Sequence, residues 1–126
     1  MPGRELQDHR RVEQMGLYYK STRNSNLKVT ASEAILKGLA PDGGLFVPEK
    51  LPVLGKSMEE LKDLNYQDTA YEVMKCFLTD FTEEELRNCI EKAYDSKFDD
   101  EAIAPLVKVE DTYYLELFHG ATIAFK

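Results

Sequence analysis

Apolar residues recur at helical spacing in two consecutive segments near the middle of the chain. The first set comprises Tyr66, Thr69, Ala70, Val73, Met74, Phe77 and Leu78, and the second comprises Leu86, Cys89, Ile90, Ala93, Tyr94 and Phe98. Because the spacing follows i, i+3, i+4 and i+7, it predicts two amphipathic helices. About four residues join them, and so short a connection favours antiparallel packing. We therefore expect a helical hairpin in this region.

Three capping boxes mark where helices begin. Each is a Ser or Thr followed three residues later by Glu, so that each side chain accepts a hydrogen bond from the other residue's backbone. The box at residues 30–33 predicts a short helix through Lys37, with Gly38 as its left-handed exit. The box at residues 57–60 predicts a brief helix that ends near Leu64. The box at residues 82–85 begins the second hairpin helix, and Asn65 caps the first.

Short strands surround these helices. Residues 17–19 (LYY) and 45–47 (LFV) predict two strands, the second of them buried and stopped by Pro48. Residues 41–44 (PDGG) demand a tight turn with positive φ at one or both glycines. Beyond residue 100 the period changes to two, which predicts a β-hairpin from residues 106–109 and 112–118. The expected fold class is α+β, a small helical domain with a helical hairpin and short β-strands.

The composition is that of a single folded domain. The chain has 126 residues, of which 43% are hydrophobic, and its 16 basic and 23 acidic residues give a net charge of −7. Phosphate backbones would repel such a surface, so we expect no nucleic-acid partner. The apolar runs are too short to span a bilayer, so we expect no membrane partner and a cytoplasmic protein. We assign residues 15–126 to the domain and the polar residues 1–14 to a leader or disordered extension.

Taken one by one, the chain's reactive residues indicate little chemistry. Cys76 and Cys89 fall on the apolar sides of the hairpin helices, which predicts buried thiols. Together with His9 and His119 they do not form a zinc-ligand pattern, so no metal is expected. Residues 42–44 could line a site, but their composition is first of all that of a tight turn. Composition and spacing alone thus reach only a soluble, acidic α+β domain.

Three separated segments together resemble threonine synthase. They are residues 19–23 (YKSTR), 38–48 (GLAPDGGLFVP) and 117–126 (LFHGATIAFK), and residues 64–66 and 81–86 also fit the family's amino-terminal region. The resemblance extends from about residue 17 to the end of the chain, with order and spacing kept. Ala121 stands where the family often has proline, and Ile123 where leucine is frequent; both keep the apolar character.

The resemblance implies a lyase that depends on pyridoxal phosphate. Threonine synthases convert O-phosphohomoserine and water into threonine and phosphate, and the lysine after Ala-Phe carries the cofactor as a Schiff base. That lysine corresponds to Lys126, which the resemblance implies as the catalytic and cofactor-binding residue. The complete protein would have the larger α/β architecture of tryptophan-synthase-β-like enzymes. This chain would be its amino-terminal domain, ending at the lysine motif, inactive alone and able to self-associate through apolar surface that includes residues 123–125.

Two further residues are candidates for substrate binding. Arg23 lies in the polar bend after the first strand, and a guanidinium suits a phosphate or a carboxylate. His119 either orients the loop that carries Lys126 or lines the mouth of the active site. Each residue also has a purely structural interpretation, as a surface or acid-paired arginine and as a hydrogen-bonded histidine.

Two alternative functions stay open from the sequence. One is a natural short relative that keeps this domain as a binding module without catalysis, although an end inside a catalytic motif speaks against it. The other is a related pyridoxal-phosphate enzyme, a serine/threonine dehydratase or a tryptophan-synthase-like lyase. Those relatives share the Phe-Lys neighbourhood but lack the segment at residues 38–48.

Overall fold

The computed structural model describes residues 16–122, which belong to two separate units. The units are Met1–Leu54 with Met74–Glu83, and Gly55–Val73 with Glu84–Lys126. The leader expected at residues 1–14 and the apolar residues 123–125 lie outside the described part of the chain.

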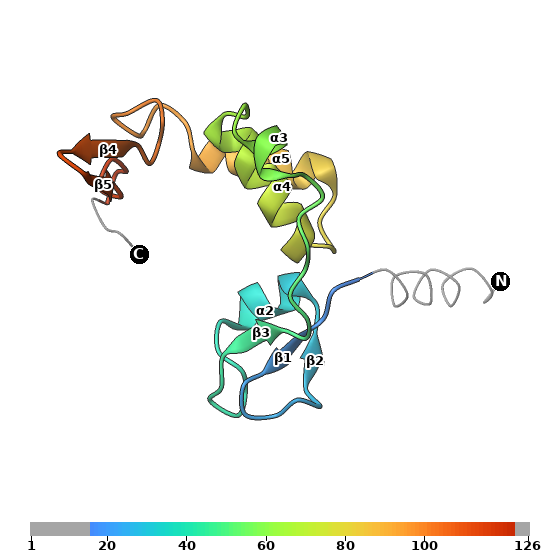
Figure 1. Ribbon diagram of the computed structural model, residues 1–126. Helices are drawn as coiled ribbons and strands as arrows, with labels where there is room; N and C mark the ends of the chain where they lie inside the picture. The colour runs from blue at the N-terminus through green and yellow to red at the C-terminus, as the bar shows by residue number, and fades with distance from the viewer. Residues whose placement is uncertain (1–15, 123–126) are drawn as a thin grey trace. The chain divides into compact units, whose positions relative to one another are not determined.

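A three-stranded antiparallel sheet organises the first unit (Figure 1). Its strands are β2 (Lys28–Val29), β1 (Tyr19–Ser21) and β3 (Phe46–Pro48), in that spatial order. Tyr19 pairs with Val29 on one side and with Pro48 on the other, so β1 is the central strand. The buried apolar side chains of this unit include Leu17, Val29, Ala31, Ala34 and Ala40.

The first capping box produces the helix that it predicts. Helix α2 (Ala31–Lys37) begins after Thr30, whose hydroxyl oxygen accepts from the Glu33 N–H at 3.3 Å. In return, the Glu33 carboxylate accepts from the Thr30 N–H at 2.8 Å. Gly38 ends the helix with φ of +71°, as predicted, and its N–H donates to the Ala34 carbonyl.

The strands of this unit differ from the predicted ones at their ends. The first strand begins at Tyr19, so the prediction of residues 17–19 was placed two residues early. The third begins at Phe46 and includes Pro48, whereas we expected Pro48 to stop it. A proline is tolerated there because β3 is an edge strand and needs no outward N–H donor. The strand is only half-buried, and Leu45 is exposed, which corrects the prediction of a buried strand. Strand β2 was not predicted.

The second unit contains helices and a separate hairpin (Figure 1). Its elements include α3 (Met58–Leu61), β4 (Leu106–Val109) and β5 (Thr112–Leu115). Helix α4 (Tyr66–Phe77) has residues in both units, and α5 (Glu83–Ala93) belongs to the second unit except for its first residue. The predicted capping box of α3 is present, and the helix ends three residues before the predicted Leu64. The Asn65 side chain caps α4 by accepting from the Asp68 N–H at 2.8 Å, as expected.

Contacts within the second unit confirm the helical hairpin. Near the start of α4, the Gln67 amide donates to the carbonyl of Tyr94, which follows the end of α5. One turn further along, the Arg87 guanidinium lies 4.0 Å from the centre of the Tyr71 ring. The first contact joins the beginning of α4 to the end of α5, and the second joins the middle of each helix, as expected for antiparallel helices.

The buried side of α5 is narrower than the sequence predicts. Leu86 and Ile90 are buried, as predicted, whereas Cys89 and Ala93 are exposed and Cys76 on α4 is half-buried. The prediction of two buried thiols was therefore wrong. Periodicity places a residue on the apolar side of a helix, but it does not show how far the neighbouring elements extend over that side.

The β-hairpin forms where the period of two predicts it. Leu106 pairs with Leu115 and Val109 with Thr112, and all eight strand residues are exposed. Glu110 in the turn has φ of +54°, the sign that a tight hairpin turn requires. The second strand ends at Leu115 instead of the predicted residue 118.

We predict that Gly44→Ala destabilises the chain by about 2 kcal/mol. A Cβ at Gly44 would lie 2.2 Å from the Ser21 hydroxyl oxygen and 3.0 Å from both the Asp42 carboxylate and the Thr22 hydroxyl. Urea unfolding of the 126-residue chain measures the loss. Gly55→Ala is the matched control, because a Cβ there meets nothing within 4 Å.

The same measurement in a Ser21→Ala background tests the cause. Without the Ser21 hydroxyl the closest steric conflict disappears, so Gly44→Ala should cost clearly less there than in the unaltered chain. Equal costs in both backgrounds would show that the Ser21 hydroxyl is not what excludes a side chain at residue 44.

Candidate functional site

The turn after α2 joins two of the segments that resemble threonine synthase. The Asp42 carboxylate oxygen Oδ1 accepts from the Ser21 hydroxyl at 2.7 Å and from the Gly44 N–H at 2.9 Å. The Ser21 hydroxyl oxygen accepts in turn from the Arg23 N–H at 3.1 Å. Gly43 has φ of +80°, which confirms the predicted positive φ at one of the two glycines. These bonds fix the exit of β1 against the turn.

Arg23 lies on the exposed rim of this turn. Its guanidinium nitrogen Nη1 donates to the Asp42 carbonyl at 3.1 Å. Hydrogen bonds from Ser21 and Gly44, followed by the Arg23 charge, lower the pKa of Asp42. A guanidinium carries five N–H donors, so a single bond to a carbonyl leaves it capable of binding an anion.

His119 is held between two carboxylates of its own unit. Its Nδ1 lies 2.5 Å from an Asp99 oxygen, and its Nε2 lies 2.7 Å from a Glu116 oxygen. A neutral imidazole carries one N–H donor, so an imidazole with a carboxylate at each nitrogen is best satisfied in its protonated form. Hydrogen bonds to Glu116 and then to Asp99 accordingly raise the pKa of His119.

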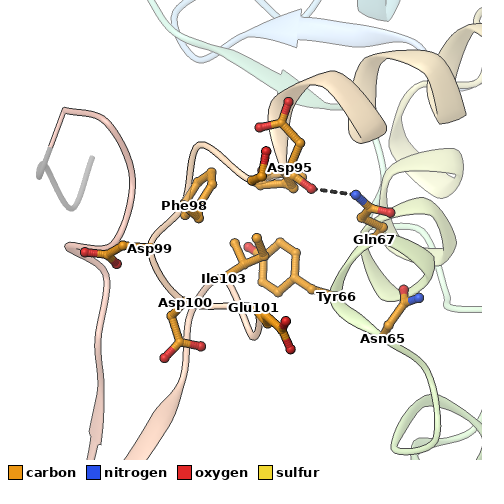
Figure 2. Close-up of a pocket in the computed structure, with 11 residues that line it drawn as sticks. Asn65, Tyr66, Gln67, Asp95, Phe98, Asp99, Asp100, Glu101 and Ile103 are labelled. Carbon is orange, nitrogen blue, oxygen red and sulfur yellow. Dashed lines mark hydrogen bonds between the residues drawn. The ribbon is translucent and has the colours of Figure 1, made fainter.

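A hollow of about 430 Å³ lies beside this histidine's partner Asp99 (Figure 2). Aromatic rings line it, and those of Tyr66 and Tyr94 meet edge to face with centroids 4.9 Å apart. The residues that line it also include four acidic ones, Asp95, Asp99, Asp100 and Glu101. Carboxylates repel anions, so this hollow does not suit a phosphate group. The sequence analysis did not predict it.

The structure places the predicted site residues in different units. Arg23 belongs to the first unit and His119 to the second, and Lys126 lies outside the described residues. Sequence analysis missed Ser21 and Asp42 as partners of the Arg23 turn, and Asp99 and Glu116 as partners of His119. The three-residue spacing between Glu116 and His119 was a local signal, whereas Asp99, twenty positions away, gave none.

The described part of the chain contains neither a cluster of metal ligands nor a membrane-spanning helix. Within residues 16–122, no three histidine, cysteine, aspartate or glutamate side chains gather as ligands for a metal ion. No helix in that range combines the length and the apolar character needed to cross a bilayer.

Known proteins with similar sequences and structures include threonine synthases. A family model for the threonine synthase N terminus matches residues 18–94. The threonine synthase of Eremothecium gossypii is 42% identical over 122 residues, which cover 89% of this chain and 24% of that protein. The chain therefore spans about a quarter of the length of such curated relatives.

Solved structures agree with the sequence comparison. The crystal structure of threonine synthase from yeast superposes with a TM-score of 0.77 at 34% identity, over 86% of this chain and 23% of that one. Threonine synthase from Brucella melitensis, solved with pyridoxal phosphate bound, superposes with a TM-score of 0.76 at 32% identity, over 86% of this chain and 24% of that one. These matches also confirm the α+β fold as that of a part of a larger enzyme. The chain belongs to the threonine synthase family and corresponds to that family's amino-terminal region.

Proposed function

We propose that this chain supplies the cofactor-binding lysine of a cytoplasmic threonine synthase, which converts O-phosphohomoserine and water into threonine and phosphate. The observation that carries the proposal is the family match, combined with the motif LFHGATIAFK at residues 117–126. Because the chain spans about a quarter of its relatives, the residues that complete the active site belong to the other three quarters of their length.

Pyridoxal phosphate fits the chemistry of the donor that this chain offers. The cofactor has an aldehyde, which a lysine amine binds covalently, and Lys126 is the amine that the motif provides. When bound, the cofactor supplies an electron sink for carbanions formed on the substrate. The four acidic residues that line the hollow of the second unit do not favour the cofactor's phosphate there.

We assign Arg23 to the binding of the substrate's phosphate or carboxylate. Its support is the exposed guanidinium, held at one nitrogen by the Asp42 carbonyl, on a turn that joins two family segments. The Asp42 carbonyl fixes the side chain in place, which lowers the entropic cost of binding an anion.

Replacement of Lys126 by alanine in the complete polypeptide should abolish covalent cofactor binding. The expected result is loss of the cofactor's visible absorption and of borohydride-dependent labelling at residue 126, because no other amine takes its place. Lys50→Ala, an exposed lysine of the first unit, should leave both signals unchanged. Labelling at a lysine other than Lys126 would overturn the assignment.

Arg23→Ala in the complete enzyme should raise KM for O-phosphohomoserine about tenfold or more, with a smaller change in kcat. Steady-state kinetics give the two constants separately. Since Arg23 also bonds to the turn, urea unfolding of the same variant is needed as a control for stability. An unchanged KM would contradict the assignment of Arg23 to substrate binding. Partial recovery of KM in Arg23→Lys would support a role for the positive charge.

A further inference from the structure

His119 and Gly120 contact the residues that follow α5 through several independent interactions. Besides the two contacts of the imidazole, the Asp99 N–H donates to the His119 carbonyl at 3.1 Å. Gly120 lies against the Phe98 ring so closely that a Cβ would meet a ring carbon at 3.1 Å. Backbone, side chain and ring contacts therefore hold the same short stretch of chain.

The two carboxylates of this arrangement are not equivalent. The Glu116 side chain is 27% exposed and the Asp99 side chain 78%, while the His119 side chain between them is only 13% exposed. An ionic hydrogen bond is stronger where water is excluded, so Glu116 is the principal partner and Asp99 the outer one. With a carboxylate at each ring nitrogen, His119 has no nitrogen left for a substrate while these bonds persist.

We propose that Asp99, Glu116 and His119 form a clamp that positions the segment leading to Lys126, and that Asp99 and Glu116 are positioning residues for the cofactor lysine. The proposal rests on the proposed function of Lys126. His119 precedes Lys126 by seven positions, so an anchored His119 limits the Cα of residue 126 to within about 25 Å of a fixed point. Such confinement reduces the conformational freedom that the segment before Lys126 must lose when the amine binds the aldehyde.

The clamp is expected to depend on pH. The charged groups that face the imidazole are Asp99 and Glu116, and both favour the imidazolium. Because the pKa of His119 is raised in the folded chain, the clamp is complete below the ordinary value of about 6.5 and weakens as the pH rises through the raised value. Deprotonation leaves one of the two carboxylates without a donor.

The first test uses the 126-residue chain without cofactor. NMR titration of the His119 ring should show its pKa falling toward 6.5 in Glu116→Gln and, by a smaller amount, in Asp99→Asn. Exchange of the Asp99 amide hydrogen should speed up on the order of tenfold in Glu116→Gln, since this amide donates to the His119 carbonyl. Glu91→Gln, on the exposed side of α5, is the matched control and should change neither.

The second test uses the complete polypeptide with pyridoxal phosphate. Glu116→Gln should weaken cofactor binding at Lys126 on the order of tenfold, and the unaltered protein should show a similar loss as the pH rises through the His119 pKa. If Lys126→Ala binds the cofactor as well as the unaltered protein does, the proposed function fails. If Lys126 is required but Glu116→Gln binds normally, only the clamp proposal fails. Unchanged His119 titration in both carboxylate variants also overturns the clamp.

Discussion

The Asp42 carboxylate holds the exit of the central strand and the glycine turn of the first unit in one network. Ser21, whose side chain is the most buried polar group described in the chain, donates to it, and so does the Gly44 backbone. A buried hydroxyl proton without an acceptor costs free energy, so removal of the carboxylate would leave the Ser21 O–H donor unsatisfied inside the unit. The close approach also explains the glycine at position 44, where a Cβ would overlap the hydroxyl oxygen. The position of Arg23 follows from this network, because its backbone N–H and its guanidinium both bond to members of it.

Local signals predicted the helices well and the strands less well. A capping box such as that of Thr30 and Glu33 involves residues three apart, so the sequence alone contains all of its partners. A strand of two or three residues exists only because a neighbour pairs with it, and β2 and β3 are each defined by their register with β1. Ser21 shows the same limit. The sequence placed it in a polar bend, whereas in the structure it ends β1 and is buried, with a carboxylate twenty-one residues away as its hydrogen-bond acceptor.

The sequence predicted which residues belong to the candidate site, but it did not predict the groups with which they form hydrogen bonds. Arg23 could be named because a guanidinium suits an anion, and Lys126 because a family motif ends in it. The surroundings of His119 could not be foreseen, since Asp99 approaches it through a long intervening loop and hairpin. Residue type indicates what a side chain is able to bind, and only the fold shows which neighbouring groups it already contacts.

The distribution of charge separates two kinds of role in this chain. Around His119 and the hollow of the second unit, carboxylates predominate, and the imidazolium is already paired with two of them. Carboxylates in that region would repel an anionic substrate. A histidine in this setting is therefore better suited to positioning the chain than to binding an anion. Arg23 differs, because its guanidinium donates to a neutral backbone carbonyl and its side chain is exposed. A phosphate would therefore find attraction at the turn of the first unit, and the second unit would act by fixing the segment that leads to the lysine.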